Sequence, residues 1–531
     1  MTEIGKGTGA STPRPEGPVR HSPMMHEAQL WDAWFARAGR EWLERFLVSS
    51  YLREQRWFGA KARPLTAFHL RDFCWIPHDS GVWLYGQGEA EFSSGPTEAY
   101  FIFLGMATTL PAGAQALMEV PGSPLGPAVL FDAADDPAAG RAVLDWLDGE
   151  SSIQTEHGHL RCQRFELLVS DRASLPVARS KAEQSNTNLI FGEQYVLKLF
   201  RRYQPGLNPD YEISRFLREH TSFRKTPPLL GVMLYRHRDE EPMVAALLQG
   251  WVPNRGDAWS QAVRSVVSQL EGRGKDAVGF DITLLARRTA EFHLAMASAP
   301  LDPVFGLEPL SQTDLEQVGQ RIRDNLTRGL TLLEQRGPQL TPRALALGQS
   351  LAAQREALLG CLHVPQLDPP PAKLRIHGDY HLGQVLCTPE GDFVLLDFEG
   401  EPGQPLSERR ARQSPLRDVA GMLRSFGYAA EAALITVLAR GPGNEEELAS
   451  AAHHWEGQAV EQFLETYLGV VGKAPFVPED AQLLRRILSL YIFDKALYEL
   501  LYELNNRPKW AVIPLRGIHR LLDGAECGEG S

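Results

Sequence analysis

Two short apolar segments that each lead to an aspartate constrain this chain more than any other feature. The first, I-H-G-D-Y-H-L-G-Q-V-L over residues 376–386, contains Asp379 and Gln384, and the second, F-V-L-L-D-F-E, contains Asp397. The letters T-P-E-G-D between them place proline early and glycine late, which is typical of a turn. The pattern therefore predicts two short strands paired as a β-hairpin. Such a hairpin brings the side chains of Asp379, Gln384 and Asp397 close together.

Two carboxylates and an amide oxygen at one place suit phosphoryl transfer. A divalent cation must bridge the nucleotide phosphates there, while a separate carboxylate accepts the proton of the attacking hydroxyl. Asp379 precedes Gln384 by five residues, which is the interval between base and metal-binding amide in the protein-kinase pattern H-R-D-x-x-x-x-N, with Gln in place of Asn. The alternative is a buried Asp and Gln that satisfy a tight turn. The second aspartate, at the end of a second apolar strand, argues against that alternative.

An upstream segment supplies a candidate phosphate-binding lysine. The letters Y-V-L-K-L-F alternate as a strand does and place Val196 and Lys198 on one face. This looks like the V-A-I-K strand of protein kinases, in which the lysine holds nucleotide phosphates and a small apolar residue lines the adenine pocket. The letters N-P-D-Y-E from Asn208 predict a helix start, and Glu212 in its first turn is the predicted partner of Lys198. Taken alone, Lys198 suits an edge strand and Glu212 the helix dipole.

Two further segments are candidates for binding the nucleotide. A glycine-free loop with Gln184, Ser185 and Asn186 precedes the lysine strand, where protein kinases carry a Gly-rich loop. Its polar groups would cap the phosphates, or the loop is an ordinary polar turn. The apolar run M-V-A-A-L-L predicts a strand that leaves the small lobe, and the residues at its end would present backbone groups to the adenine edge: Gln249, Trp251 and Val252.

A helix predicted over residues 490–504 carries a polar and aromatic face. The residues on that face recur at i, i+3, i+4 and i+7, and they are Lys495, Tyr498, Glu499 and Tyr502. The face would line an acceptor cleft or, as this spacing more commonly indicates, pack against neighbouring elements. Elsewhere, we predict His293 as a satisfied core histidine and Asp418 as a structural brace for the loop around Asp379.

Composition excludes several classes of partner and location. The chain has 531 residues, with 54 Lys and Arg against 66 Asp and Glu, for a net charge of −12. Because such a surface repels phosphate backbones and anionic lipids, we expect neither nucleic acid nor a membrane as partner. The chain has five cysteines and no C-x-x-C motif, and we find no secretory signal and no apolar run of about 18 residues. We therefore expect reduced thiols in a cytoplasmic protein.

The chain divides into four predicted regions. Residues 1–28 are rich in Gly, Pro and Ser and predict a disordered tail. Residues 29–135 predict a small mixed α/β module, and residues 136–252 a second one. Helical periodicity dominates residues 253–531, apart from the hairpin.

On these residues the chain resembles the maltokinases, bacterial enzymes of the aminoglycoside-phosphotransferase-like kinase superfamily. The resemblance covers nearly everything after the tail. Its most specific strings are R-W-F-G-A-K near the start and D-F-E-G-E-P after the hairpin, joined by the loop before the lysine strand, V-L-K, N-P-D-Y-E, K-A-L-Y-E and N-R-P. The resemblance implies a bilobed, protein-kinase-like α+β fold with an N-terminal cap subdomain (29–135), a small mixed-sheet lobe (136–252) and a mainly helical C-lobe (253–531).

The resemblance also implies an activity and a set of roles. The activity is ATP-dependent phosphorylation of maltose to maltose 1-phosphate for α-glucan and glycogen synthesis, with trehalose synthase as a pathway partner and a monomer or homodimer as the assembly. Asp379 would be the catalytic base, Gln384 and Asp397 would hold Mg²⁺, and Lys198, fixed by Glu212, would grip the α- and β-phosphates. His381 and Glu399 would touch phosphate, metal shell or sugar, and the resemblance favours Lys495 and Tyr498 in the acceptor cleft.

Two alternatives to maltose phosphorylation stay open. One is a kinase of the same fold that acts on glucosamine or an aminoglycoside, whose site would present extra carboxylates to an ammonium group. The other is a catalytically silent pseudokinase that serves as a scaffold for trehalose synthase. The presence of Lys198, Asp379, Gln384 and Asp397 together argues against the second alternative.

Overall fold

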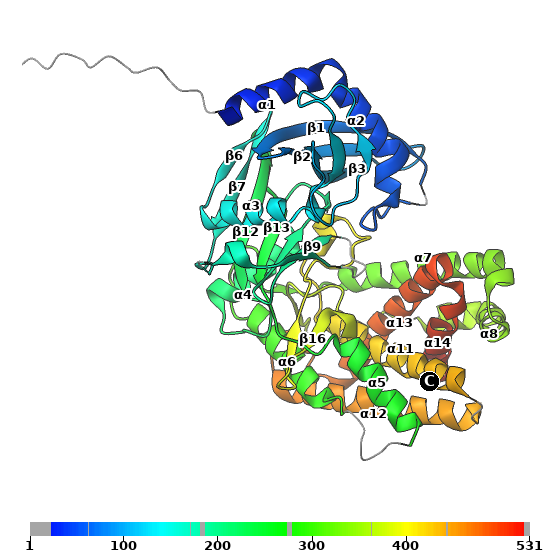
Figure 1. Cartoon of the computed structure of the whole chain (residues 1–531). Coiled ribbons are helices and arrows are strands. Elements are labelled where there is room, and N and C mark those ends of the chain that lie inside the picture. Colours follow the sequence, from blue (N-terminus) through cyan, green and yellow to red (C-terminus); the bar gives the residue numbers. More distant parts are fainter. Residues whose placement is uncertain are drawn as a thin grey trace, which may run out of the picture.

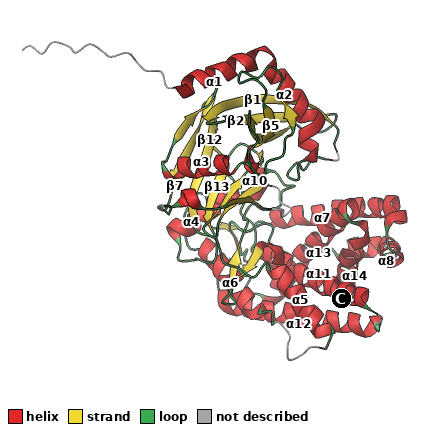
Figure 2. Cartoon of the chain, in the orientation of Figure 1, coloured by secondary structure: helices red, strands yellow, loops and turns green. Residues whose placement is uncertain are grey.

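A computed structural model describes residues 23–61, 63–169, 171–180, 186–272, 279–362, 364–441 and 444–524. Figure 1 shows a β-rich part, coloured blue to green, above a helical part, coloured green to red. Figure 2 shows the same division by secondary structure. The predicted α+β fold with a mainly helical C-terminal lobe is therefore confirmed. The predicted tail lies outside the described residues as far as residue 22, but helix α1 begins at Pro23, inside the stretch for which disorder was predicted.

The first sheet is antiparallel and packs against an N-terminal helical stretch. Large aromatic side chains on that stretch, such as Trp31 and Phe35, bury themselves in one core with Phe68 and Leu84 of the sheet. The helical pieces are α1 (Pro23–Trp34), η1 (Phe35–Gly39), α2 (Arg40–Phe46), η2 (Leu47–Tyr51) and η3 (Leu52–Glu54). The strand order is β1-β2-β3-β5-β4, and β11 pairs with β3. The strands are β1 (Leu65–His78), β2 (Gly81–Phe92), β3 (Glu98–Ala107), β4 (Met118–Glu119), β5 (Val129–Asp132) and β11 (Arg202–Tyr203).

The second sheet carries the lysine strand near its centre. Its order is β6-β7-β12-β13-β10-β9-β8, so β10 lies between β13 and β9. Both helices beside it begin where the sequence provides an N-cap and a proline: Asp136 caps α3 and Asn208 caps α4. The elements are α3 (Pro137–Asp148), β6 (Ser152–Gln154), β7 (Gly158–Arg164), β8 (Val177–Arg179), β9 (Thr187–Phe191), β10 (Tyr195–Leu199), α4 (Pro209–His220), β12 (Leu229–His237) and β13 (Met243–Gly250).

The helical lobe is built around α11, which packs against α5, α12 and α13. By length and apolar composition α11 would also span a membrane, but 67% of its apolar window is buried inside the lobe, as in a core helix. The helices are α5 (Ala258–Leu270), α6 (Ile282–Met296), α7 (Gln312–Arg336), α8 (Pro342–Ala353), α9 (Arg355–Cys361), α10 (Leu406–Arg409), α11 (Leu416–Arg440), α12 (Glu445–Val471), α13 (Ala481–Asn506) and α14 (Val512–Gly524). A short ladder pairs β14 (Glu308–Pro309) with β15 (Ala372–Lys373). Short helical turns are η4 (Ala133–Asp135), η5 (Arg172–Ser174), η6 (Gly337–Gln339), η7 (Leu382–Gln384) and η8 (Pro508–Trp510).

The predicted hairpin is confirmed. Strands β16 (Val385–Cys387) and β17 (Phe393–Leu395) pair antiparallel, with Leu386 opposite Val394. Its turn is anchored by Asp392, which accepts hydrogen bonds from Arg288 Nε at 2.7 Å and Nη2 at 2.8 Å. Because Arg288 belongs to α6, the hairpin is held against the helical lobe.

Candidate active site

The loop that carries Asp379 is held from below by a buried aspartate. Asp418 is 1% exposed, and its two carboxylate oxygens accept hydrogen bonds from His377 N at 2.8 Å and Gly378 N at 2.9 Å. Gly378 has φ +83°, which glycine adopts without strain. His293, fully buried, contacts Asp418 Oδ2 at 3.2 Å and Tyr467 Oη at 2.9 Å. The predictions of Asp418 as a brace and His293 as a satisfied core residue are both confirmed.

Lys198 lies among three carboxylates. Its Nζ is 2.9 Å from Asp210 Oδ2 and 2.5 Å from both Asp397 Oδ1 and Glu399 Oε1. Burial by itself lowers the pKa of Lys198, but the three carboxylates outweigh burial and raise it well above its usual value. Burial also keeps the pKa of Glu399 raised, although Lys198 lies beside it. The ammonium is therefore fixed at the place where strand β10 faces the end of the hairpin.

The predicted pairing of Lys198 with Glu212 is wrong. Glu212 instead accepts hydrogen bonds from Arg375 Nη2 at 3.1 Å and from Arg410 Nε and Nη2 at 3.0 and 2.7 Å. The carboxylate beside Lys198 is Asp210, two residues earlier in the first turn of α4. A helix turns by about 100° per residue, so the two side chains point in directions about 200° apart. Glu212 thus contacts the helical lobe and Asp210 the lysine.

Gln384 and Asp397, the predicted metal ligands, lie together. Gln384 Nε2 donates to Asp397 Oδ2 at 3.2 Å, and His377 Nε2 lies 2.8 Å from the carbonyl oxygen of Leu396. Asp397 has φ +63°, a conformation that non-glycine residues rarely adopt and that is enriched at functional sites. The Lys198 ammonium lowers the pKa of Asp397 even though burial opposes this. Asp397 therefore stays ionised.

The carboxylates that contact the Lys198 ammonium in this structure are also of the type that binds a divalent cation. Asp210, Asp397 and Glu399 each offer an oxygen, and these oxygens lie within 4.8 Å of one another. Oxygen donors are the ligands that Mg²⁺ prefers, and Mg²⁺ is usually held by one or two protein carboxylates together with substrate phosphates. Of the residues predicted to contact substrate or metal, Glu399 belongs to this cluster. It also accepts a hydrogen bond from Asn186 Nδ2 at 2.6 Å.

Asp379 is paired with a lysine from the C-terminal helix α13. Lys495 Nζ lies 3.2 Å from Asp379 Oδ1 and 2.9 Å from Glu401 Oε1. Burial raises the pKa of Asp379, but Lys495 and the neighbouring His381 outweigh it, so the pKa is lower than usual. Burial lowers the pKa of His381, which keeps its ring neutral near pH 7. Its Nδ1 accepts a hydrogen bond from Gly383 N at 3.0 Å.

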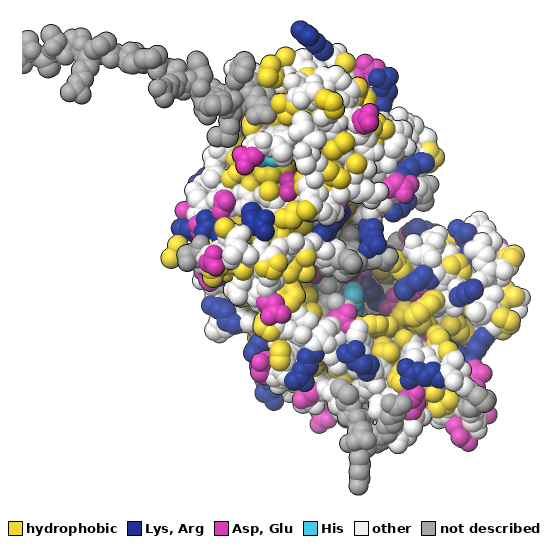
Figure 3. Space-filling view, in the orientation of Figure 1, with side chains coloured by type: hydrophobic (Ala, Val, Ile, Leu, Met, Phe, Trp, Pro, Cys, Tyr) yellow, Lys and Arg dark blue, Asp and Glu magenta, His cyan; other side chains and the backbone are white. Residues whose placement is uncertain are grey.

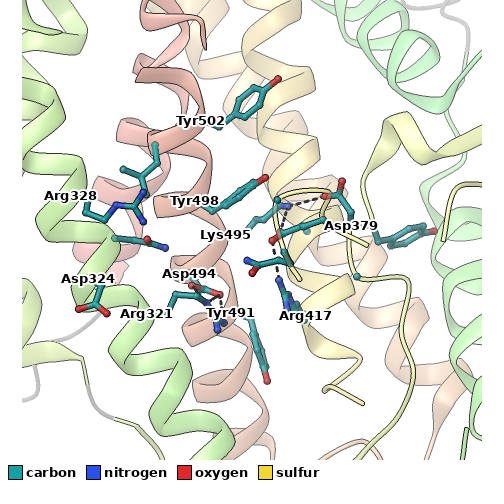
Figure 4. Close-up of a pocket in the computed structure, with 18 of the residues that line it drawn as sticks. Arg321, Asp324, Arg328, Asp379, Arg417, Tyr491, Asp494, Lys495, Tyr498 and Tyr502 are labelled. Carbon is teal, nitrogen blue, oxygen red and sulfur yellow. Dashed lines mark hydrogen bonds and ion pairs between the residues drawn. The ribbon is translucent and has the colours of Figure 1, made fainter. Parts of the chain in front are cut away.

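A pocket of about 690 Å³ opens beside Asp379. Figure 3 shows the molecule hollowed between its two parts, and Figure 4 shows Asp379, Lys495 and Arg417 on one side of the pocket and Arg321, Asp324 and Arg328 on the other. Helix α13 supplies Lys495, Tyr498 and Tyr502, as predicted, while α7 supplies the opposite wall. The main polar and aromatic lining residues are Gln317, Gln320, Arg321, Asp324, Asn325, Arg328, Asp379, Tyr380, Glu401, Gln404, Arg417, Tyr491, Asp494, Lys495, Tyr498, Tyr502, Asn505 and Asn506.

Glu499 does not line this pocket, contrary to the prediction. It accepts hydrogen bonds from Arg424 Nε at 3.0 Å and Nη2 at 2.7 Å. If Lys495 marks 0° on the α13 helical wheel, Tyr498 and Tyr502 lie at about −60° and −20°, and Glu499 at about +40°. The pocket faces the first arc, and α11, which carries Arg424, faces Glu499. His381 is likewise absent from the pocket lining and stays near Asp379.

The residues predicted to bind the nucleotide lie on or beside the lysine strand. Val196 pairs with Gln249 across β10 and β13, and Trp251 N donates to the carbonyl oxygen of Gln194 at 2.8 Å. The carbonyl oxygen of Val252 accepts a hydrogen bond from Asn254 Nδ2 at 2.8 Å. Two of the predicted loop residues, Gln184 and Ser185, lie outside the described residues.

Asp210 and Glu401, which contact the two site lysines, were missed at the level of sequence, and so was the α7 wall of the pocket. Asp210 precedes the predicted Glu212 in the same acidic first turn. The sequence therefore predicted an acidic partner for Lys198 in this turn, but the wrong one of its two acidic residues was chosen. Glu401 follows Glu399 at an interval of two in D-F-E-G-E-P, and only the path of the chain after Gly400, at φ +72°, turns it toward Lys495.

Comparison with known proteins identifies the family. Residues 177–454 match the model of the phosphotransferase enzyme family, and residues 51–136 match that of the maltokinase N-terminal cap domain. The chain therefore belongs to the phosphotransferase enzyme family, and the predicted resemblance and kinase-like fold are confirmed. The cap match supports membership close to the maltokinases within this family.

Similar proteins include two curated relatives named glucosamine kinase. The chain is 26% identical to that of Streptacidiphilus jiangxiensis over 346 residues, 64% of this chain and 72% of the relative. It is 27% identical to that of Mycolicibacterium smegmatis (strain ATCC 700084 / mc(2)155) over 388 residues, 72% and 87% of the two chains. A solved glucosamine kinase in complex with glucosamine, ADP and inorganic phosphate superposes with a TM-score of 0.61 at 19% identity, over 90% of this chain and 99% of that one. A second crystal form of glucosamine kinase gives 0.63 at 18% identity, with the same coverage. These structures share the fold of this chain.

Proposed function

We propose that the protein is a maltose kinase, which transfers the γ-phosphoryl group of ATP to the anomeric hydroxyl of maltose and forms maltose 1-phosphate for α-glucan and glycogen synthesis. The observation that carries the proposal is the charge balance of the pocket beside Asp379. Together with the match to the maltokinase cap domain, it favours a neutral sugar of more than one ring over an amino sugar.

The acidic residues of the pocket are largely matched by cations. Asp379 and Glu401 share Lys495, and Glu401 also accepts from Arg417 Nη2 at 3.2 Å. Asp494 accepts from Arg321 through three contacts of 2.7–3.1 Å. An amino sugar carries an ammonium that needs a carboxylate of its own, because a charge held away from water without a partner is costly. Hydroxyl groups need only donors and acceptors of the amide, phenol and guanidinium type, which this pocket has in number.

One carboxylate of the pocket, Asp324, stands apart from the others. Among the described residues it accepts a hydrogen bond from a neutral group, Gln320 Nε2, at 2.9 Å, and Figure 4 shows it across the pocket from Asp379. An ammonium next to the reacting hydroxyl of a monosaccharide would lie near Asp379 and so far from Asp324. The pocket volume of about 690 Å³ is also in the range of sites for ligands larger than a single sugar ring.

The proposed mechanism assigns each group a role. Asp379 orients the acceptor hydroxyl and takes its proton as the oxygen attacks the γ-phosphorus, while the bond from that phosphorus to the β–γ bridging oxygen breaks and ADP leaves. Lys198 holds the α- and β-phosphates, with Asp210 as its fixed partner. Asp397 and Gln384 would hold Mg²⁺, which would supply positive charge to offset that of the nucleotide phosphates. The backbone after β13 and the face of β10 that carries Val196 would receive the adenine.

A glucosamine kinase is the second candidate, because the two curated relatives carry that name. A coupled assay of ADP release with ATP, Mg²⁺ and a panel of glucose, glucosamine, maltose and kanamycin separates the candidates. We expect turnover with maltose and a kcat/KM for glucosamine at least tenfold lower. Turnover with glucosamine but not with maltose refutes the proposal, and no turnover with any of them supports a pseudokinase.

We also propose the setting in which the enzyme works. The enzyme would be a cytoplasmic monomer or homodimer, and trehalose synthase would supply or compete for its maltose. The acidic charge of −12 and the absence of nucleic-acid or membrane features in the composition support a cytoplasmic setting. Size-exclusion chromatography with light scattering, alone and with trehalose synthase, tests the assembly state and the partner.

A further inference from the structure

Glu401 is a buried carboxylate whose two oxygens contact two different cations. It is 5% exposed, and its Oε1 accepts from Lys495 Nζ at 2.9 Å while its Oε2 accepts from Arg417 Nη2 at 3.2 Å. Arg417 lies in the first turn of α11 and also donates to Gln413 Oε1, so it is fixed at a second point. Glu401 is thereby tied to the core helix of the lobe.

Lys495 contacts two carboxylates, and Asp379 is one of them. The same Nζ lies 3.2 Å from Asp379 Oδ1 and 4.8 Å from the ring centre of Tyr498. A lysine ammonium sits on a flexible four-carbon stem, so one contact of 3.2 Å does not by itself fix its position. The shorter contact to Glu401 supplies the second point that does. Figure 4 shows the dashed line that joins Lys495 to Asp379.

The two carboxylate oxygens of Asp379 differ in their hydrogen bonding. Oδ1 faces Lys495, whereas Oδ2 makes no hydrogen bond within the part of the chain that the structure describes. A catalytic base must hold one oxygen in position toward the acceptor hydroxyl. A cation fixed on Oδ1 leaves Oδ2 to receive the proton.

We propose that Glu401 is a positioning residue for phosphoryl transfer: anchored by Arg417, it holds the Lys495 ammonium on Asp379 Oδ1 and so presents Asp379 Oδ2 to the acceptor hydroxyl. The inference rests on the proposed function of the site as a sugar kinase, whichever sugar it accepts. Glu401 itself does not take part in the proton transfer.

A double-mutant cycle tests the inference. The variants are Glu401→Gln, Lys495→Met and the two combined, and kcat and both KM values are measured by ADP release with the acceptor that the wild type uses. We expect E401Q to lower kcat about 10- to 100-fold with the KM for ATP within twofold. The double variant should match K495M within about twofold, because Glu401 acts through Lys495. Multiplication of the two effects, or an unchanged kcat in E401Q, overturns the inference.

Glu499→Gln is the matched control, because it also removes a glutamate–arginine contact, here partly buried, from the same lobe but lies away from the pocket. It should change the melting temperature without changing kcat more than about twofold. If E401Q does not fold, Arg417→Gln replaces it: kcat should then fall in the wild-type background and stay constant in the K495M background, and equal losses in both refute the inference.

Crystal structures of the wild type and E401Q give a readout that does not depend on activity. Lys495 Nζ should stay within hydrogen-bond distance of Asp379 Oδ1 in the wild type and leave it in E401Q. Retention of that contact in both overturns the inference, even if the acceptor proves not to be maltose. A wild type that phosphorylates glucosamine instead refutes only the proposed function.

Discussion

Asp210 and Glu212 lie two residues apart in one helical turn, and the structure predicts that their removal affects different properties. Loss of Asp210 should affect catalysis, and loss of Glu212 should affect stability. Asp210→Asn keeps the shape of the side chain but removes one of the three carboxylates around Lys198. A hydrogen bond to a charged group contributes about 1.5–3 kcal/mol. Because Lys198 keeps Asp397 and Glu399, we expect the low end of that range. At ~1.4 kcal/mol per factor of ten, kcat/KM for ATP should fall about tenfold.

Glu212→Gln should act on stability instead. Its carboxylate is the partner of Arg375, which is 1% exposed, and of Arg410. Burial lowers the pKa of Arg375 although Glu212 opposes this, so the Glu212 carboxylate offsets part of the cost of burying the guanidinium. Breaking a buried ion pair costs roughly 3–5 kcal/mol. At about 2.1 cal/mol/K of unfolding entropy per residue, this lowers the Tm of a 531-residue chain by about 3–5 °C.

The two variants are compared in one pair of assays. ADP release at varied ATP gives kcat/KM, and scanning fluorimetry gives Tm. D210N should lower kcat/KM for ATP about tenfold with a Tm within about 1 °C of the wild type, and E212Q should lower Tm by about 3–5 °C with kcat/KM for ATP within about threefold. The reverse pattern, in which E212Q weakens ATP and D210N does not, refutes this reading of the lysine site.

Two other predictions follow from the site and its support. Asp379→Asn should lower kcat by about 10²–10⁴-fold with Tm unchanged, since the base is lost but the loop stays braced by Asp418; a loss below tenfold contradicts its role as base. The hairpin turn should be acid-sensitive: although burial opposes it, hydrogen bonds from Arg288 and Lys225 hold the pKa of Asp392 well below its usual value. A carboxyl group with a depressed folded-state pKa stabilises the protein above its unfolded pKa of about 3.9, and this contribution is lost as pH falls below that value. Tm measured from pH 7 to pH 3 should therefore show D392N less stable than the wild type at pH 7, with the two curves converging below about pH 4, and a constant gap contradicts the assignment.

Features set by local periodicity were predictable from the sequence. The lysine strand, the hairpin and the C-terminal helix each follow from the spacing of apolar residues over a short window, and the structure contains all three as β10, β16–β17 and α13. The loop brace at Asp418 was also predictable, because a lone acidic residue before an apolar helix start needs partners when buried.

The sequence did not show which side chain of a helix faces the site when the choice depends on a residue far away in the chain. Asp210 and Glu212 are equivalent as acidic residues of a first turn, and the choice between them depends on where Arg375, more than 160 residues later, enters the core. Glu499 lies only about 40° from Lys495 on the helical wheel. The position of α11, and with it Arg424, decides that Glu499 turns away from the pocket.

The two-residue strand β11 has a consequence for the design of truncated variants. Arg202 and Tyr203 follow the lysine strand in sequence, yet they pair with Tyr100 and Ala99 of the first sheet, and Phe101 N donates to the carbonyl oxygen of Arg201 at 2.7 Å. Removing the N-terminal 135 residues would strip a hydrogen-bonded neighbour from the chain four residues beyond Lys198. A truncated enzyme would then report on a damaged nucleotide site as much as on a missing cap, so point substitutions in β3 are the cleaner way to ask what the cap contributes.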